Sequence, residues 1–253
     1  MRIRYSVSLW NYSHYTNVLS LERVIALLRE QDYGIELWGS WKEEKDLFDE
    51  VGRKRLKHVL QGMTVSLHTA GADTFDLHKK QIDAAVDLGA EVVVLHSSDF
   101  FTKTNRDLNV QLACKAVAYA SEQGVRLALE NGQLPFLVNA IEKVEGLSIC
   151  LDVGHVYLTP DPMSKFLDAL KERIIHLHIQ DVLSEAEVGL PCTGKDHYIP
   201  GTGGIPDKDW NLFATTLQEI NFRGIAVFEI QPRNPLQTAF LGRAFMQNLL
   251  ETG

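Results

Sequence analysis

Residues 64–131 read TVSLHTAGADTFDLHKKQIDAAVDLGAEVVVLHSSDFFTKTNRDLNVQLACKAVAYASEQGVRLALEN. Three short apolar runs, at 64–70, 91–98 and 126–131, alternate here with two segments, 75–89 and 108–124, whose apolar residues recur every three or four positions. Such short runs are typical of buried strands, and such segments are typical of amphipathic helices. Gly89 and Gly124 stand where each helical segment gives way to the next strand, a common position for a helix-ending glycine. The stretch therefore predicts consecutive β-α units.

The same alternation continues toward both ends of the chain. Further strand candidates lie at 3–10, 34–38, 147–152, 174–181 and 224–230, which makes eight in all. Their spacing of about 25–45 residues fits eight β-α units, and 253 residues is a typical length for a barrel of that kind. A doubly wound open sheet would use the same alternation, but no GxGxxG follows the first strand, where SLWNYSHYTN stands instead. We expect one α/β domain over residues 1–253, folded as a (β/α)8 TIM barrel.

Composition restricts the partners of the protein. The formal net charge is −8, from 25 basic and 33 acidic residues, so the chain has no overall electrostatic attraction to nucleic acid or to an anionic membrane. No apolar run approaches the ~20 residues of a membrane span, and the N-terminus does not resemble a signal peptide. Cys114, Cys150 and Cys192 have no CxxC spacing, which favours free thiols in a reducing compartment. We expect a cytoplasmic protein with a small-molecule partner, and a homo-oligomer stays open.

Acids and histidines gather at the predicted strand ends. Seven of the eight strand candidates carry one at or beside the C-terminal end, and they are Glu36, His68, His96, Glu130, Asp152, His178 and Glu229. In a barrel these ends meet on one face, where active sites lie. Burying so many ionisable groups costs several kcal/mol each unless something compensates, and a divalent cation can do so. The pattern therefore predicts a metal site.

Two further features lie near this cluster in the sequence. His176 and His178 face the same way by the two-residue period of a strand, and we expect His178 to be the ligand and His176 to pack or to hydrogen-bond behind it. The long segment 182–207 contains GTGG at 201–204. A turn of the loop is the first interpretation of these glycines, and contact with a phosphate through backbone N–H groups is the second.

Five motifs carry a resemblance to a known family: ALEN at 128–131, LDVGH at 151–155, HLHIQD at 176–181, DHYIPGTGGI at 196–205 and VFEI at 227–230. In this order and spacing they resemble the xylose isomerase-like barrel superfamily, which includes sugar and sugar-phosphate isomerases and epimerases, inosose dehydratases and endonuclease IV. The resemblance implies one divalent metal held by Glu130, Asp152, His178 and Glu229. In the epimerase branch it also implies that Glu130 and Glu229 transfer the proton, through a metal-stabilised enediolate.

Further residues take their expected roles from the same resemblance. His155 is similar to a family histidine that contacts substrate oxygen or binds a further metal, and Glu36, Trp10 and Trp38 resemble walls of the substrate pocket. His68 and His96 match first-metal ligands of endonuclease IV, while His155 and His197 match two of its third-metal ligands. The remaining ligand there is an Asp two residues before the histidine, where this chain has Lys195, with Asp196 displaced by one position. Whether this second ring holds metal or substrate stays open.

The expected function is an isomerase or epimerase of a sugar, sugar phosphate or polyol, dependent on Mn2+, Mg2+, Co2+ or Zn2+. The number and identity of the ions are open. One alternative is an endonuclease IV-like multi-zinc phosphodiesterase, which the acidic net charge and the scarcity of basic residues in the strand-following loops disfavour. A dehydratase (lyase) acting on a cyclic polyol would use nearly the same residues. A barrel kept only for binding is the non-enzymatic alternative.

Overall fold

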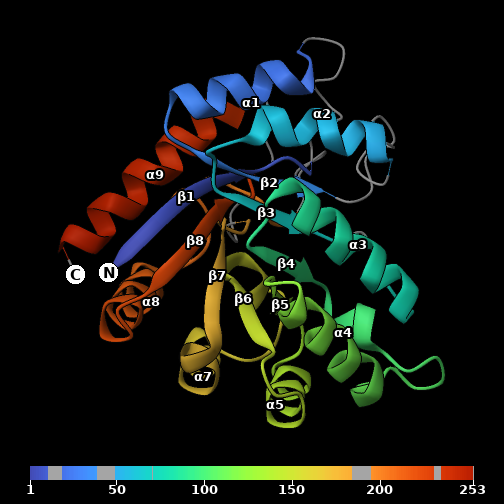
Figure 1. Ribbon diagram of the computed structural model, residues 1–253. Helices are drawn as coiled ribbons and strands as arrows, with labels where there is room; N and C mark the ends of the chain where they lie inside the picture. Colours follow the sequence, from blue (N-terminus) through green and yellow to red (C-terminus); the bar gives the residue numbers. More distant parts are fainter. Residues whose placement is uncertain (11–18, 39–48, 70, 184–194, 231–234, 253) are drawn as a thin grey trace.

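Eight parallel strands close into a barrel (Figure 1). The structure is a computed structural model that describes residues 1–10, 19–38, 49–69, 71–183, 195–230 and 235–252. Each strand pairs with the next along the chain, and the last pairs with the first. The strands are β1 (Arg2–Ser8), β2 (Gly34–Trp38), β3 (Val65–His68), β4 (Val92–Leu95), β5 (Arg126–Glu130), β6 (Ser148–Asp152), β7 (Ile174–Ile179) and β8 (Arg223–Phe228). The predicted barrel is confirmed, and the open sheet is excluded.

Helices surround the strands on the outside of the barrel (Figure 1). The side chains of Ser20, Thr74 and Asn109 accept hydrogen bonds from the first helical turns that follow them, so these helices begin where the apolar period begins. Gly89 ends one helix at a φ of 75°, a left-handed conformation that glycine adopts without strain. The helices are α1 (Leu21–Glu30), α2 (Glu50–Leu60), α3 (Phe75–Leu88), α4 (Val110–Glu122), α5 (Leu134–Lys143), α6 (Val153–Val156), α7 (Met163–Leu170), α8 (Asp207–Glu219) and α9 (Pro235–Thr252), with 3-10 turns η3 (Ser97–Phe100) and η4 (Lys171–Arg173).

The barrel has two apolar regions. The larger lies between the strands and the helices, and a smaller cluster fills the interior with Val92, Val94, Ala128, Cys150, Ile225 and Val227. Because side chains alternate along a strand, the residues two positions beyond Val94, Ala128, Cys150 and Val227 also face the interior. Those residues are His96, Glu130, Asp152 and Glu229. The alternation therefore places the polar group on an apolar floor, at the C-terminal ends of the strands.

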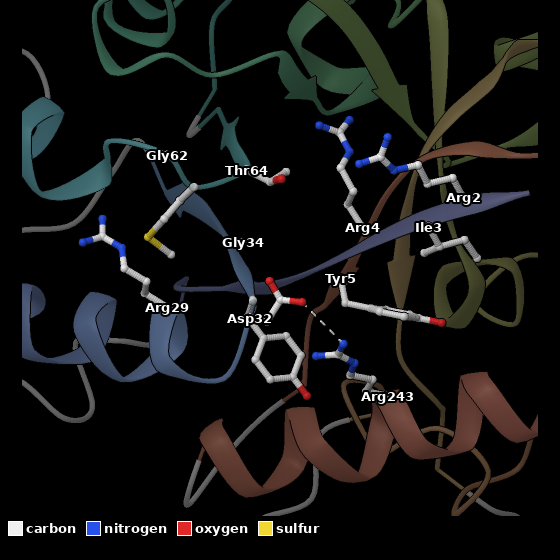
Figure 2. Close-up of a pocket in the computed structure, with 12 residues that line it drawn as sticks. Arg2, Ile3, Arg4, Tyr5, Arg29, Asp32, Gly34, Gly62, Thr64 and Arg243 are labelled. Carbon is white, nitrogen blue, oxygen red and sulfur yellow. Dashed lines mark ion pairs between the residues drawn. The ribbon is translucent and has the colours of Figure 1, made fainter.

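A cavity of about 370 Å3 opens at the opposite end of the barrel, where β1 and β2 begin (Figure 2). Its lining includes four basic side chains, Arg2, Arg4, Arg29 and Arg243. Arg4 binds both carboxylate oxygens of Glu91, and Arg243 pairs with Asp32 at 3.8 Å. Two of the four guanidinium groups thus bind acids of the same chain, and Arg29 donates to the carbonyls of Val59 and Gln61. We therefore interpret this end as structural, in line with the general role of the N-terminal face of such barrels.

Two predictions from composition have counterparts in the structure. Cys114 is exposed and Cys150 is buried, both as free thiols, whereas Cys192 lies outside the described residues. Within the described ranges, no helix combines the length and the apolar character needed to cross a membrane.

Candidate metal centre

Four buried side chains meet at the C-terminal ends of β5 to β8. One ligand atom from each of Glu130, Asp152, His178 and Glu229 lies within 4.8 Å of the others. His178 Nδ1 is 2.7 Å from Glu130 Oε1, 2.9 Å from Glu229 Oε2 and 3.7 Å from Asp152 Oδ2. The structure therefore brings together the four residues for which the sequence predicted a shared metal. We call this group the core cluster.

The charge balance of the core cluster fits a cation. Three carboxylates face one imidazole, and all four side chains are buried. Burial lowers the pKa of His178, but the surrounding acidic groups Cys150, Glu36 and Glu229 outweigh it and raise the pKa well above its ordinary value. Burial raises the pKa of Glu130, but the charges of His155 and His178 hold it well below its ordinary value. A protonated His178 thus offsets only part of the negative charge of the three carboxylates. A divalent cation would offset more of it, and an oxygen-rich set with one nitrogen suits Mn2+, Mg2+, Co2+ or Zn2+.

Asp152 is held by groups that the sequence prediction did not single out. Its Oδ1 accepts a hydrogen bond from the backbone N–H of His155 at 2.8 Å and so caps α6. Its Oδ2 accepts a hydrogen bond from Gln180 Nε2 at 2.6 Å. The amide of Asn131 bonds both the N–H and the carbonyl of Asp152. Asn131 and Gln180 belong to the ALEN and HLHIQD motifs, so their position in the motifs was the available signal. Together these hydrogen bonds fix the orientation of the Asp152 carboxylate.

A second group of ligand atoms shares Glu130. Glu130 Oε2 lies 3.5 Å from His96 Nε2 and 3.8 Å from His68 Nε2. In a tetrahedral zinc site with bonds of about 2.0–2.1 Å, two ligand atoms lie about 3.3–3.5 Å apart, so this spacing is close to that of a cation site. His68 Nδ1 contacts the carbonyl of Thr69 at 2.9 Å, which leaves Nε2 available. The same atoms can equally hydrogen-bond a substrate.

A third group lies beside the core cluster and contains an unexpected acid. His155 Nε2 is 3.5 Å from Asp196 Oδ2, and His197 Nδ1 is 3.0 Å from Asp196 Oδ1. The one-residue displacement of Asp196 therefore does not keep its carboxylate away from the two histidines. Burial lowers the pKa of His155, but the carboxylates of Asp152, Glu130 and Asp196 outweigh it and raise the pKa to about 10.

The three remaining predicted residues divide between two places. The Trp38 ring lies 4.2 Å from the ring of His68, and the Trp10 ring lies 4.8 Å from the ring of His197. Both tryptophans therefore flank the clusters, as pocket walls would. Glu36 is 0% exposed and contacts His176 and His178, so the structure places it in the barrel interior behind His178.

The GTGG loop is held by a buried acid at the end of β7. Asp181 accepts the backbone N–H groups of Gly201, Gly203 and Ile205 at 2.9–3.0 Å. A Cβ on Gly203 would lie 2.1 Å from the carbonyl oxygen of Val182. Because these N–H groups already bind a carboxylate, the loop-turn interpretation holds for them, and they are not available to a phosphate. The preceding residues 184–194 lie outside the described part of the chain.

A protein-family model described as "Xylose isomerase-like TIM barrel" matches residues 60–249. This chain belongs to that family. The match spans most of the chain and includes all five motifs, so the predicted resemblance is confirmed.

Solved structures share the fold at low identity. The IOLI protein with a bound zinc atom is 15% identical, with a TM-score of 0.76 and 98% coverage of both chains. A D-tagatose 3-epimerase-like protein is 18% identical, with a TM-score of 0.71 over 98% of this chain and 97% of that one. A D-psicose 3-epimerase, crystallised in the presence of D-fructose, is 14% identical, with a TM-score of 0.67 over 98% and 99%. At these identities the likeness establishes the fold.

One curated relative matches part of the chain. It is a pyridoxine 5′-phosphate synthase from a Sulfurihydrogenibium species, 27% identical over 114 residues. The match covers 44% of this chain and 44% of that relative, less than half of either.

Proposed function

We propose that this protein is a divalent-metal-dependent isomerase or epimerase of a sugar, sugar phosphate or polyol. The observation that carries the proposal is the convergence of Glu130 and Glu229 on one atom, His178 Nδ1, at 2.7 and 2.9 Å. Two carboxylates beside one cation position are what a reaction needs if one removes a proton next to a carbonyl and the other returns it. The structures of similar fold support a carbohydrate substrate, since two are named for 3-epimerases, and IOLI holds zinc.

The chemistry divides between the cation and the chain. When bound by the core cluster, a divalent cation supplies positive charge that polarises a carbonyl and favours loss of the neighbouring proton. Glu130, whose pKa is held low, is ionised and able to act as a base at neutral pH. Glu229, 2.9 Å from the same His178 Nδ1, is the second carboxylate of the pair, and it would take up a proton from solvent and return it to the substrate. Trp10 and Trp38 wall the position and limit its access to water.

Exchange of substrate hydrogen with solvent tests the glutamate pair. A panel of ketoses and their phosphates, including D-fructose and D-tagatose, would be incubated in D2O with Mn2+-loaded protein and followed by NMR. We expect Glu130→Gln and Glu229→Gln each to slow deuterium uptake next to the carbonyl by about 100-fold or more, the usual size of a lost acid or base contribution.

Glu91→Gln is the matched control for that experiment. It removes one carboxylate at the far end of the barrel, where Glu91 pairs with Arg4, and should leave the exchange rate unchanged. Undiminished exchange in both core variants would rule out the two-glutamate mechanism.

A second candidate is an endonuclease IV-like phosphodiesterase, and the observation that favours it is the set of neighbouring ligand groups. His68, His96 and Glu130 form one, and His155, Asp196 and His197 form another, beside the core cluster. Elemental analysis of metal per chain, together with an assay on a duplex that contains an abasic site, separates the candidates. One ion without cleavage supports the isomerase, and two or three ions with cleavage support the nuclease. A dehydrated product would identify the lyase.

A further inference from the structure

Glu36 is buried in the barrel interior and contacts two histidines of β7. Its side chain is 0% exposed, and it reaches the interior from β2, on the far side of β1 and β8 from β7. Glu36 Oε1 lies 3.1 Å from His178 Nε2, and Glu36 Oε2 lies 2.9 Å from His176 Nε2. A carboxylate buried this completely requires partners, because leaving it unpaired would cost several kcal/mol. The two histidines of β7 are therefore the partners that allow Glu36 to be buried here.

The two nitrogens of His178 have different surroundings. Nδ1 faces the carboxylates of Glu130, Glu229 and Asp152, so it is the atom that can ligate a cation. An imidazole that ligates through Nδ1 carries its proton on Nε2, which must then donate. Among the described residues, neither Nε2 nor Glu36 Oε1 has a hydrogen-bond partner, although the two atoms lie 3.1 Å apart. When His178 ligates a cation through Nδ1, its Nε2–H can therefore donate to Glu36 Oε1, 3.1 Å away.

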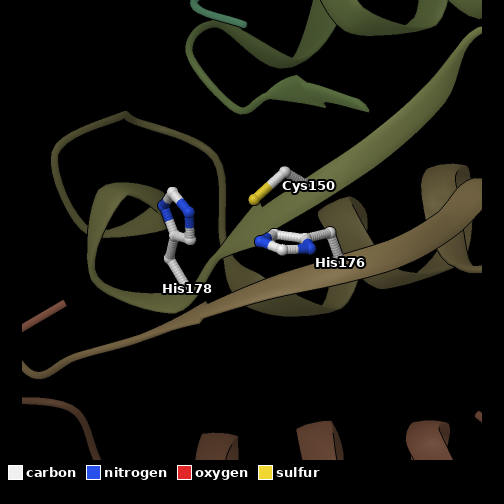
Figure 3. Close-up of side chains that lie close together, drawn as sticks. All are labelled: Cys150, His176 and His178. Carbon is white, nitrogen blue, oxygen red and sulfur yellow. The ribbon is translucent and has the colours of Figure 1, made fainter. Parts of the chain in front are cut away.

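Glu36 is itself fixed by its neighbours. Its Oε2 accepts the hydroxyl of Ser66 at 2.9 Å, in addition to the contact with His176. Figure 3 shows His176 and His178 extending from β7, with Cys150 beside them on the neighbouring strand β6. Ligand atoms of these three residues lie within 4.8 Å of one another. Because His176 Nε2 contacts Glu36 and His178 Nδ1 faces the core cluster, we interpret Cys150 as packing beneath His178.

We propose that Glu36 is a positioning residue, which holds His178 in the tautomer and ring orientation needed to ligate a divalent cation through Nδ1. The proposal rests on the metal dependence stated under the proposed function. Ligating histidines generally donate their second N–H to a carboxylate or a carbonyl, and loss of that acceptor typically lowers metal affinity 10- to 100-fold. Glu36 acts only through His178, since its carboxylate does not join the core cluster.

Co2+ titration of the metal-free protein tests this role without an activity assay. The visible absorption of bound Co2+ reports both affinity and ligand arrangement. We expect Glu36→Gln to weaken Co2+ binding about 10- to 100-fold and to change the absorption bands, because the amide can turn its NH2 toward Nε2. Glu36→Asp, which keeps the charge, should recover part of the affinity. Glu91→Gln removes an equal charge far from the site and should bind as the wild type does.

The outcomes separate this inference from the proposed function. If the wild-type chain binds no Co2+, the metal-dependent function itself fails. If the wild type binds and Glu36→Gln binds with the same affinity and spectrum, the positioning role is wrong and the function stands. Should Glu36→Gln not fold, by circular dichroism, Ser66→Ala takes its place, since it removes only one hydrogen bond from Glu36. Unchanged Co2+ affinity and absorption in both Ser66→Ala and Glu36→Asp would then overturn the proposal, because neither the anchor of the carboxylate nor its reach to Nε2 would matter.

Discussion

His155 shows how strongly single residues at this site depend on their neighbours. Its ring lies 3.4 Å from Asp152 Oδ2, 3.7 Å from Glu130 Oε1 and 3.5 Å from Asp196 Oδ2. Burial lowers the pKa of His155, yet these carboxylates raise it to about 10, compared with an ordinary value of 6.5. In the metal-free protein this histidine therefore carries a proton at neutral pH, and metal binding at adjacent ligands competes with that charge.

A stability profile follows from this shift. Because the folded chain binds the proton of His155 more tightly than the unfolded chain does, the stabilisation is complete below pH 6.5 and is lost as pH rises through about 10. We expect the free energy of unfolding of the metal-free protein, measured with urea, to decrease between pH 6.5 and 10. His155→Gln should reduce that decrease. A free energy that rises over this interval in the wild type would contradict the assignment.

At the scale of elements, β7 and the residues just after it supply the proposed metal ligand, the residue behind it and the anchor of the following loop. His178 belongs to the core cluster, and His176 contacts Glu36. Asp181, two residues beyond the strand, is 0% exposed and accepts backbone N–H groups from Val182, Gly201, Gly203 and Ile205. One acid therefore fixes the segment that leads into α8.

Loss of that acid should destabilise the chain as a whole. Asp181→Ala would leave four backbone N–H groups without their acceptor. The hydrogen bonds of Val182 and Ile205 are buried, and each buried group left unpaired costs about 1–3 kcal/mol. We expect a decrease of about 3 kcal/mol or more in the free energy of unfolding by urea, with faster amide exchange at residues 201–205.

Asp207→Asn is the control for Asp181→Ala. Asp207 is an exposed acid in the first turn of α8, where removal of its charge should cost less than about 1 kcal/mol. Equal losses from the two substitutions would show that the loop does not depend on Asp181.

At the scale of the whole molecule, the barrel has enough core to fold without a cation. A continuous apolar core joins the strands to the surrounding helices, and a second apolar cluster lies in the barrel interior below the ligand groups. A chain of this size buries enough apolar surface to be stable without a metal staple. The metal would therefore serve chemistry, as its ligand positions at the strand ends also suggest.

Removal of metal with a chelator tests whether the fold depends on a bound cation. Treatment with EDTA should leave the far-ultraviolet circular dichroism unchanged and lower the Tm by several degrees, because the stabilisation from a ligand that binds only the folded state is lost. Addition of Mn2+ or Co2+ should restore the Tm. Unfolding at 25 °C on chelation would instead identify the ion as a structural metal, as in small zinc domains.

Much of the candidate site could be predicted, because its residues occupy the same position in successive β-α units, the C-terminal end of the strand. Glu130, Asp152 and Glu229 each stand at or just beyond the end of a strand and share its inward face, and both properties follow from the two-residue period. The partners were harder to foresee. Asn131 and Gln180 carry no charge that marks them, and the spacing of Asp196 in the sequence was unfavourable, although its carboxylate reaches His155 and His197.

The sequence by itself determined the eight strands, the helices between them and the inward face of each strand, since these are properties of short segments. It also determined the ligand types, because the motifs carry them. Only the tertiary structure decided that Glu36 stands behind His178, 142 positions away in the chain, and that Asp181 occupies the N–H groups of the GTGG loop. Those contacts depend on barrel closure and strand register, which bring distant segments together and have no counterpart in the local pattern.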